Sequence, residues 1–104
     1  MLGDRLKETW LLPLRTKRSA SSRKVALAMA KSLREQFGRE IREARLQAGM
    51  SQTELGERIN KAQTYVSELE HGHINLTIDT MLLMAHAVGL KVVLGMHSEQ
   101  RRLD

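Results

Sequence analysis

Residues 49–72, GMSQTELGERINKAQTYVSELEHG, combine uncharged polar side chains with a spacing that can hold them on one surface. In a helix, Gln63, Thr64, Ser67 and Glu68 share one side. A glutamine amide offers one donor and one acceptor, which match the N6 and N7 groups of adenine in the major groove. Hydroxyls can bond to base edges or phosphates, and the Thr64 methyl can meet a thymine methyl. These residue types therefore predict that this surface reads double-stranded DNA.

The same stretch predicts the two short helices that would position this surface. Ser51 and Glu54 have the spacing of a capping box, which marks a helix start. Asn60 can take the left-handed conformation that a tight turn requires, and the next helix should end at Gly72. A helix of about eight residues, a turn and a helix of about ten residues have the spacing of a helix-turn-helix. Because the two helices must cross closely, we expect Gly56 to lie at the crossing.

Further helices are expected on both sides of this unit. Apolar residues recur every fourth position over 23–37, which predicts a helix with Ser22 as its N-cap. Gly38 predicts a bend or a helix boundary, followed by a second helix that ends at Gly49. Thr77 caps a final helix. Its expected inner face is formed by Ile78, Leu82, Ala85 and Val88. We therefore expect an all-α fold, a compact helix-turn-helix domain of about five helices.

Composition supports helices and excludes several classes of protein. Hydrophobic residues make up 41% of the 104 residues but aromatics only 3%, so an aliphatic core is expected and a β-sandwich is disfavoured. The absence of cysteine excludes disulfides and thiolate metal sites. Apolar runs are far shorter than the roughly 18 residues of a membrane span, and no secretory signal is recognisable. We expect a cytoplasmic protein of one domain with no membrane partner.

The charge distribution indicates a polyanionic partner, although a solvated helix face would also carry many charges. Residues 15–45 hold ten basic and three acidic side chains, a net charge of +7, whereas residues 51–72 carry −2. We interpret residues 1–21 as a flexible basic arm that binds phosphates or a protein toxin. The cations proposed for this role are Arg15, Lys17, Arg18, Arg23 and Lys24.

Metal and catalytic sites are not expected. The four histidines are His71, His73, His86 and His97. Two of them flank a glycine in a turn, but no acidic or cysteine cluster lies beside them, so no metal or other cofactor is predicted. The chain has no cysteine nucleophile, and no serine lies in a glycine-rich elbow. An enzyme is therefore not predicted.

Residues 37–90 resemble the Cro and phage-repressor helix-turn-helix family, also called the xenobiotic-response-element family. The matching signature is IREARLQAGMSQTELGERI…YVSELEHG…LTIDTMLLMAHAVG. The resemblance implies that Gln52 and Thr53 contact the DNA backbone, and that Arg45 and Glu70 form a structural ion pair. The complete predicted DNA-binding set is Gln52, Thr53, Lys61, Gln63, Thr64, Tyr65, Ser67 and Glu68.

Two positions depart from the family pattern. Lys61 occupies a turn position that usually holds a small apolar residue, so it is expected to reach a phosphate instead. Glu68 stands where neutral or basic residues are common. A carboxylate can accept a hydrogen bond from cytosine N4 but is repelled by phosphate, and its role is left open.

The C-terminal segment predicts a two-fold dimer. Residues 90–97, LKVVLGMH, contain the β-branched pair Val92 and Val93 and are too short for a helix, so a strand is expected at about 91–96 within a C-terminal strand and tail, 91–104. A lone strand needs a partner for its backbone groups, and a second copy would supply one at Val92, Val93 and Leu94. The remaining domain, residues 22–90, would then bind a palindromic operator as a homodimer.

Two regulatory functions remain open. A compact helix-turn-helix followed by a pairing strand is similar to HigA-type and HipB-type antitoxins, which implies a regulator that represses its own operon and neutralises a toxin. The alternative is a stand-alone phage, plasmid or restriction-system regulator. Trp10, Leu11 and Leu12 favour a protein partner for the arm, because an exposed apolar cluster is of more use to a protein than to DNA.

Overall fold

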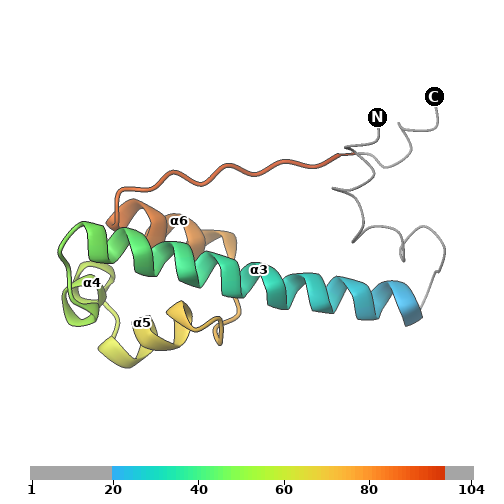
Figure 1. Cartoon of the computed structure of the whole chain (residues 1–104), viewed down its shortest axis with the longest axis horizontal. Coiled ribbons are helices and arrows are strands. Elements are labelled where there is room, and N and C mark those ends of the chain that lie inside the picture. Colours follow the sequence, from blue (N-terminus) through green and yellow to red (C-terminus); the bar gives the residue numbers. More distant parts are fainter. Residues whose placement is uncertain (1–19, 98–104) are drawn as a thin grey trace.

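The computed structural model describes residues 20–97, and this part of the chain is all-helical (Figure 1). Its four helices are α3, Ala20–Gln47; α4, Gln52–Ile59; α5, Gln63–Glu70; and α6, Ile78–Ala87. In the view of Figure 1, α6 lies above α3 and α5 below it, and α4 closes one end. The expected all-α class is confirmed. No helix of the described residues is long and apolar enough to cross a membrane.

The bend or helix boundary expected at Gly38 does not occur, so the described residues form four helices where about five were predicted. α3 is one helix of 28 residues, and it begins at Ala20, before the predicted N-cap Ser22. Glycine has a cost of about 1 kcal/mol inside a helix, but a side chain here would collide with α5. A Cβ at Gly38 would lie 2.5 Å from the carbonyl oxygen of Leu69 and 2.6 Å from that of Glu70. Gly38 therefore marks a close helix approach, not a helix end.

The signals around the two short helices are confirmed. The Ser51 hydroxyl accepts a hydrogen bond from the Glu54 N–H at 3.0 Å, and the Glu54 carboxylate accepts one from the Ser51 N–H at 2.8 Å. Asn60 ends α4 with a φ of 60° and a ψ of 47°, in the left-handed region. A Cβ at Gly56 would lie 2.5 Å from the Lys61 carbonyl oxygen, so the glycine permits the close turn into α5.

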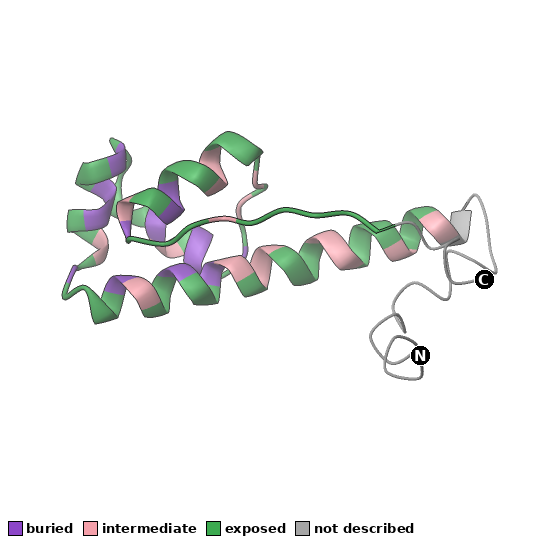
Figure 2. Cartoon of the chain, turned by 90° about the horizontal axis from the view of Figure 1, so that it is seen from above, coloured by how far each residue is buried: buried purple, intermediate pink, exposed green. Residues whose placement is uncertain are grey.

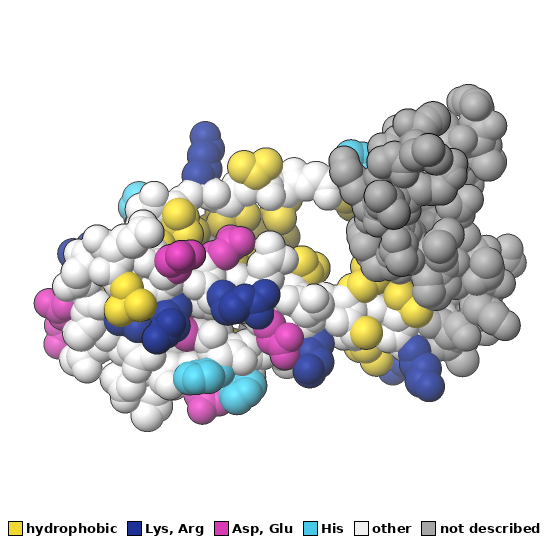
Figure 3. Space-filling view, in the orientation of Figure 1, with side chains coloured by type: hydrophobic (Ala, Val, Ile, Leu, Met, Phe, Trp, Pro, Cys, Tyr) yellow, Lys and Arg dark blue, Asp and Glu magenta, His cyan; other side chains and the backbone are white. Residues whose placement is uncertain are grey.

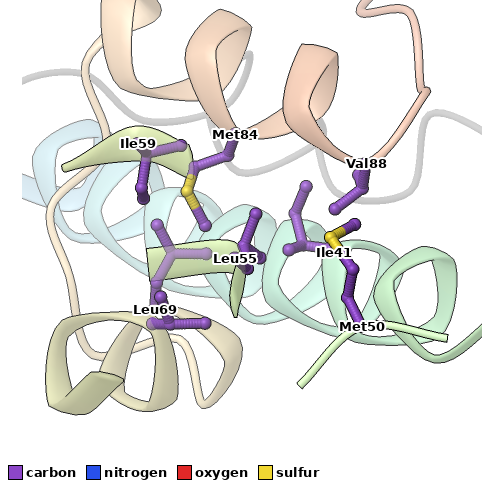
Figure 4. Packing of buried hydrophobic residues seen from close by; sticks show 8 residues of the cluster. Ile41, Met50, Leu55, Ile59, Leu69, Met84 and Val88 are labelled. Carbon is purple, nitrogen blue, oxygen red and sulfur yellow. The ribbon is translucent and has the colours of Figure 1, made fainter. Parts of the chain in front are cut away.

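The core lies between the second half of α3 and the three shorter helices (Figure 4). Its largest fully buried side chains are Ile41, Leu55, Val66, Leu69 and Met84. The first half of α3 contributes no fully buried side chain among the described residues and extends beyond the core (Figure 2). The core therefore fixes α5 against the second half of α3, and the first half of α3 extends beyond it.

The predicted inner face of α6 was partly wrong. Ile78 and Leu82 are 55% and 50% exposed, whereas Met84, Ala85 and Val88 are buried. Together with the half-buried Met81, the buried residues follow the i, i+3, i+4, i+7 spacing of a helix face. Because the sequence of α6 is apolar on several sides, two stripes fit the periodicity, and only tertiary packing selects between them. Thr77 caps the helix as predicted, since its hydroxyl accepts from the Thr80 N–H at 3.1 Å.

The C-terminal strand is not formed in the described residues. Residues 91–97 run extended alongside α3 without regular secondary structure (Figures 1 and 2). No hydrogen bond joins their backbone groups to other backbone groups of the described chain. The physical reason is that a strand exists only where a second strand pairs with it, and this single chain offers none there. The arm residues 1–19, including Arg15, Lys17 and Arg18, lie outside the described residues.

The close approach at Gly38 gives a test of the fold. Substitution Gly38→Ala would gain about 1 kcal/mol of helix propensity but force α3 away from two backbone carbonyls, and overpacking of this kind costs about 1–3 kcal/mol. We expect a net loss of stability, measured as a lower midpoint of urea unfolding by circular dichroism. Gly95→Ala is the control, because nothing lies within 4 Å of its Cβ position. An alanine at position 38 that stabilises the protein would contradict the packing.

Candidate nucleic-acid interface

One side of α5 is buried and the other is exposed. Val66 and Leu69 are 0% and 1% exposed and pack into the core. Thr64 and Glu68 are exposed and Ser67 is half-buried, on the outward side. This outward side, together with the first residue of the helix, Gln63, is called the reading surface below. The sequence prediction that these polar residues share one accessible surface agrees with their exposure.

Two glutamines from different helices are joined at the start of the reading surface. The Gln63 Nε2 donates to Gln52 Oε1 at 2.5 Å, and the Gln52 Nε2 donates to the Glu70 carboxylate at 3.0 Å. A glutamine amide has two N–H donors and an acceptor oxygen. Each glutamine therefore keeps one N–H for an external partner, and Gln63 also keeps its oxygen. No pattern in the sequence predicts this connection, because the two glutamines are eleven residues apart.

A buried ion pair holds this arrangement from behind. The Arg45 Nε donates to Glu70 Oε2 at 2.7 Å and its Nη2 donates to Glu70 Oε1 at 3.1 Å, while Nη1 donates to the Met50 carbonyl at 2.8 Å. The two side chains are only 7% and 1% exposed. Bidentate arginine–carboxylate pairs fix orientation as well as distance. The pair thus ties α3, the loop before α4 and the last turn of α5 into one unit.

The turn between α4 and α5 presents a cation next to the reading surface. The ammonium of Lys61 lies 4.9 Å from the centre of the Tyr65 ring, within cation–π range. Tyr65 itself is half-buried and packs against the core. Of the predicted DNA-binding set, Tyr65 is therefore in part a structural residue. Lys61 and, on the first turn of α4, Thr53 are exposed.

The reading surface ends at two histidines whose contacts were not predicted from the sequence. His73 Nδ1 lies 3.1 Å from the Glu68 carboxylate, His71 Nδ1 lies 2.8 Å from the Ser67 carbonyl, and the two rings stack. The signal for this was Gly72, whose φ of 82° reverses the chain and brings residue 73 back toward residue 68. Within residues 20–97, no group of three or more potential metal ligands is found.

Charge is divided between α3 and the helix-turn-helix. The seven basic residues of α3 outnumber its three acids, whereas residues 51–72 carry a net charge of −2. Arg23 and Lys24, predicted as cations of the arm, instead belong to the first turns of α3 and are exposed. Figure 3 shows lysine and arginine side chains distributed along α3. Within residues 20–97, the positive charge that a polyanion would meet is therefore carried largely by α3.

The residues predicted for dimer contact lie together elsewhere. Val92, Val93 and Leu94 line a groove of about 650 Å³ with residues of α3 and α6. Val93 is 84% and Leu94 62% exposed. Leu33 and Phe37 of α3 form part of the opposite wall. The groove is separate from the reading surface, since neither Gln63 nor Glu68 belongs to its lining.

Comparison with protein families gives one match. Residues 41–94, just over half of the chain, match the model of a family described as helix-turn-helix. This range contains α4, α5 and α6 and the last seven residues of α3. Comparisons with curated proteins and with solved structures give no match.

Proposed function

This chain belongs to the helix-turn-helix family of the Cro and phage-repressor type and is a DNA-binding transcription regulator; from that premise we propose that it binds a palindromic operator with α5 in the major groove. The observation that carries the proposal is the hydrogen bonding of the Gln63 amide. One of its N–H groups is held by Gln52. The remaining N–H can donate to adenine N7 while the oxygen accepts from N6.

The neighbouring side chains fall into two groups, those suited to phosphate contacts and those suited to base contacts. The second N–H of Gln52, the Thr53 hydroxyl and the Lys61 ammonium flank the reading surface and suit phosphate contacts, which position the protein. Thr64 and Ser67 suit base edges. Glu68, held by His73, can accept from cytosine N4, which would make it a specificity residue and not an affinity residue.

Selection from a random pool tests this function directly. Duplexes retained by the full chain should converge on an inverted repeat, with half-sites about 10 base pairs apart as two-fold symmetry requires. We expect adenine at one position of each half-site, opposite Gln63. A pool that shows no sequence enrichment after repeated rounds would refute specific operator binding.

A second copy is proposed to complete the DNA-binding unit. A single α5 reads only a few base pairs, so two copies with half-sites roughly 34 Å apart are needed for useful specificity. The extended backbone of residues 91–97 has no backbone partner in the described chain, and Val93, Leu94 and Met96 are exposed beside the apolar groove. Pairing with the same segment of a second copy would satisfy the backbone groups and cover these side chains.

Proline at position 93 tests the pairing. Val93→Pro removes a backbone N–H from the proposed ladder, so the dimer should dissociate at protein concentrations where the wild type remains dimeric, and operator affinity should fall with it. Sedimentation equilibrium measures the first effect and fluorescence anisotropy the second. Val93→Ala retains the N–H and is the matched control. An unaltered dimer in the proline variant would exclude this segment as the interface.

We further propose that the regulator is an antitoxin, and a stand-alone regulator is the alternative. The antitoxin role is supported by the similarity in layout to HigA-type and HipB-type antitoxins and by the apolar cluster Trp10, Leu11 and Leu12. Affinity purification of the full chain from its native host should recover one co-purifying protein, identified by mass spectrometry.

The arm can be tested in the same experiment. Deletion of residues 1–19 leaves α3 intact and should remove a protein partner while the affinity for DNA at 150 mM salt changes little. Recovery of no protein by the full chain would favour the stand-alone regulator. Retention of the protein by the truncated chain would place the contact outside the arm.

A further inference from the structure

We propose that the side of α3 facing α5 is a second phosphate-binding surface, which extends the DNA contact beyond the end of the reading surface through Lys24, Lys31 and Arg42. These three residues are called the α3 basic row. The inference rests on the proposed DNA binding by α5 and adds flanking phosphates to it.

The need for such a surface follows from charge. Non-specific and much of specific DNA affinity comes from cations that replace counterions at phosphates. Residues 51–72 cannot supply this alone, because Glu54, Glu57, Glu68 and Glu70 outnumber Arg58 and Lys61. Further cations must therefore come from other parts of the chain, and among the described helices the basic α3 packs against α5.

Packing places the α3 basic row beside α5. Gly38 lies against the carbonyls of Leu69 and Glu70, and a Cβ at Gly72 would lie 2.7 Å from the Glu35 side chain. Residues 35 and 38 therefore mark the side of α3 that faces the C-terminal end of α5.

Helical spacing puts the row on this same side. Lys31 is one turn before Glu35 and bonds to it at 3.1 Å, Lys24 is seven residues before Lys31, and Arg42 is one turn after Gly38. All three cations are exposed.

α3 is long enough to reach phosphates beyond the end of α5. From Glu35, which lies beside Gly72 just after α5, to Lys24 the helix advances about 16 Å at 1.5 Å per residue. The major groove is about 12 Å wide, so a helix leaving the end of an inserted α5 can reach the phosphates that border the groove. In Figure 1 the first half of α3 continues past the end of α5, and Figure 3 shows lysine and arginine side chains along it.

The Lys31–Glu35 pair does not block this role. Its side chains are 67% and 41% exposed, and exposed pairs of this kind contribute little to stability. Exchange of the carboxylate for a phosphate therefore costs little. The same pair predicts that one substitution strengthens DNA binding. Glu35→Gln frees Lys31 and removes a negative charge, so the affinity for DNA should rise.

Salt dependence of binding tests the inference with the full chain. The probes are a duplex of arbitrary sequence and the duplex recovered by selection, each titrated between 50 and 200 mM salt. Lys24→Gln combined with Lys31→Gln should flatten the plot of log affinity against log salt by about 1.8, which is about 0.9 for each lost contact. Arg39→Gln combined with Arg58→Gln removes the same charge from exposed positions outside the row and should leave the slope unchanged.

The outcomes separate this inference from the proposed function. A wild type that binds neither duplex would refute both. A wild type that binds, with equal slopes in both double variants and no gain from Glu35→Gln, would refute the α3 basic row alone. If Lys24→Gln with Lys31→Gln keeps the slope but loses a co-purifying protein, the row serves a protein partner and the inference is also refuted.

Discussion

Glu70→Gln is expected to cost about 3–5 kcal/mol of folding free energy, the range found when one partner of a buried ion pair is removed. The substitution keeps the shape of the side chain but leaves the Arg45 guanidinium, 7% exposed, without a compensating charge. Because small domains have total stabilities of about 5–15 kcal/mol, this single change should bring the protein close to its unfolding threshold. Urea unfolding followed by circular dichroism measures the loss.

Two further variants identify the cause of that loss. Glu35→Gln breaks the exposed Lys31–Glu35 ion pair, which lies on α3 as Arg45 does. This change should lower the folding free energy by less than about 0.5 kcal/mol. Replacing Arg45 and Glu70 together by methionine removes both charges, and apolar replacement of a buried pair is often neutral or stabilising. We expect most of the stability to return, less the cost of losing the partners of the Met50 carbonyl and of one Gln52 N–H. A Glu70→Gln variant as stable as wild type would show that the pair is dispensable.

Gln63→Ala is expected to weaken binding to the selected operator by about 1–3 kcal/mol, the discrimination supplied by one bidentate base contact. Tenfold in affinity corresponds to about 1.4 kcal/mol, so the loss should be roughly 5- to 150-fold. Binding to a duplex of arbitrary sequence should change little, because phosphate contacts are untouched. Fluorescence anisotropy with both duplexes measures the difference.

The control for this prediction is another exposed glutamine. Gln47→Ala, at the end of α3, should alter neither affinity. Stability should also be retained in Gln63→Ala, since Gln63 is exposed and its removal leaves the Gln52–Glu70 contact in place. Equal losses on both duplexes would show that Gln63 contacts the DNA backbone and does not read a base.

The sequence was sufficient where a structural signal is local. The capping box of Ser51 and Glu54, the left-handed Asn60 and the Thr77 cap each depend on residues within four positions, and all were predicted. The reading surface followed from helical spacing alone. The pairing of Arg45 with Glu70 was accessible only through resemblance, because its partners lie 25 residues apart.

The failures arose where tertiary contacts outweigh local preference. Gly38 is a poor helix residue, yet α3 passes through it because α5 requires the space. In α6 the apolar residues surround the helix, so periodicity could not separate Ile78 and Leu82 from the buried Met84. The Gln52–Gln63 contact depends on how α4 and α5 cross, and no pattern in the sequence encodes that crossing at the level of single atoms.

The continuity of α3 through Gly38 has a mechanical consequence. At 1.5 Å per residue, its 28 residues form a rod of about 42 Å, of which the far half is free of the core and the near half is locked to α5 through Arg45. A molecule that bound the free half of α3 and tilted it would therefore also change the orientation of α5. A fragment that begins at residue 41, the first residue matched by the family model, would keep only seven residues of α3. Seven residues are too few to form a helix on their own. Because such a fragment would also lose Gly38 and its close approach to the Leu69 and Glu70 carbonyls, the continuity of α3 helps to hold α5 in position.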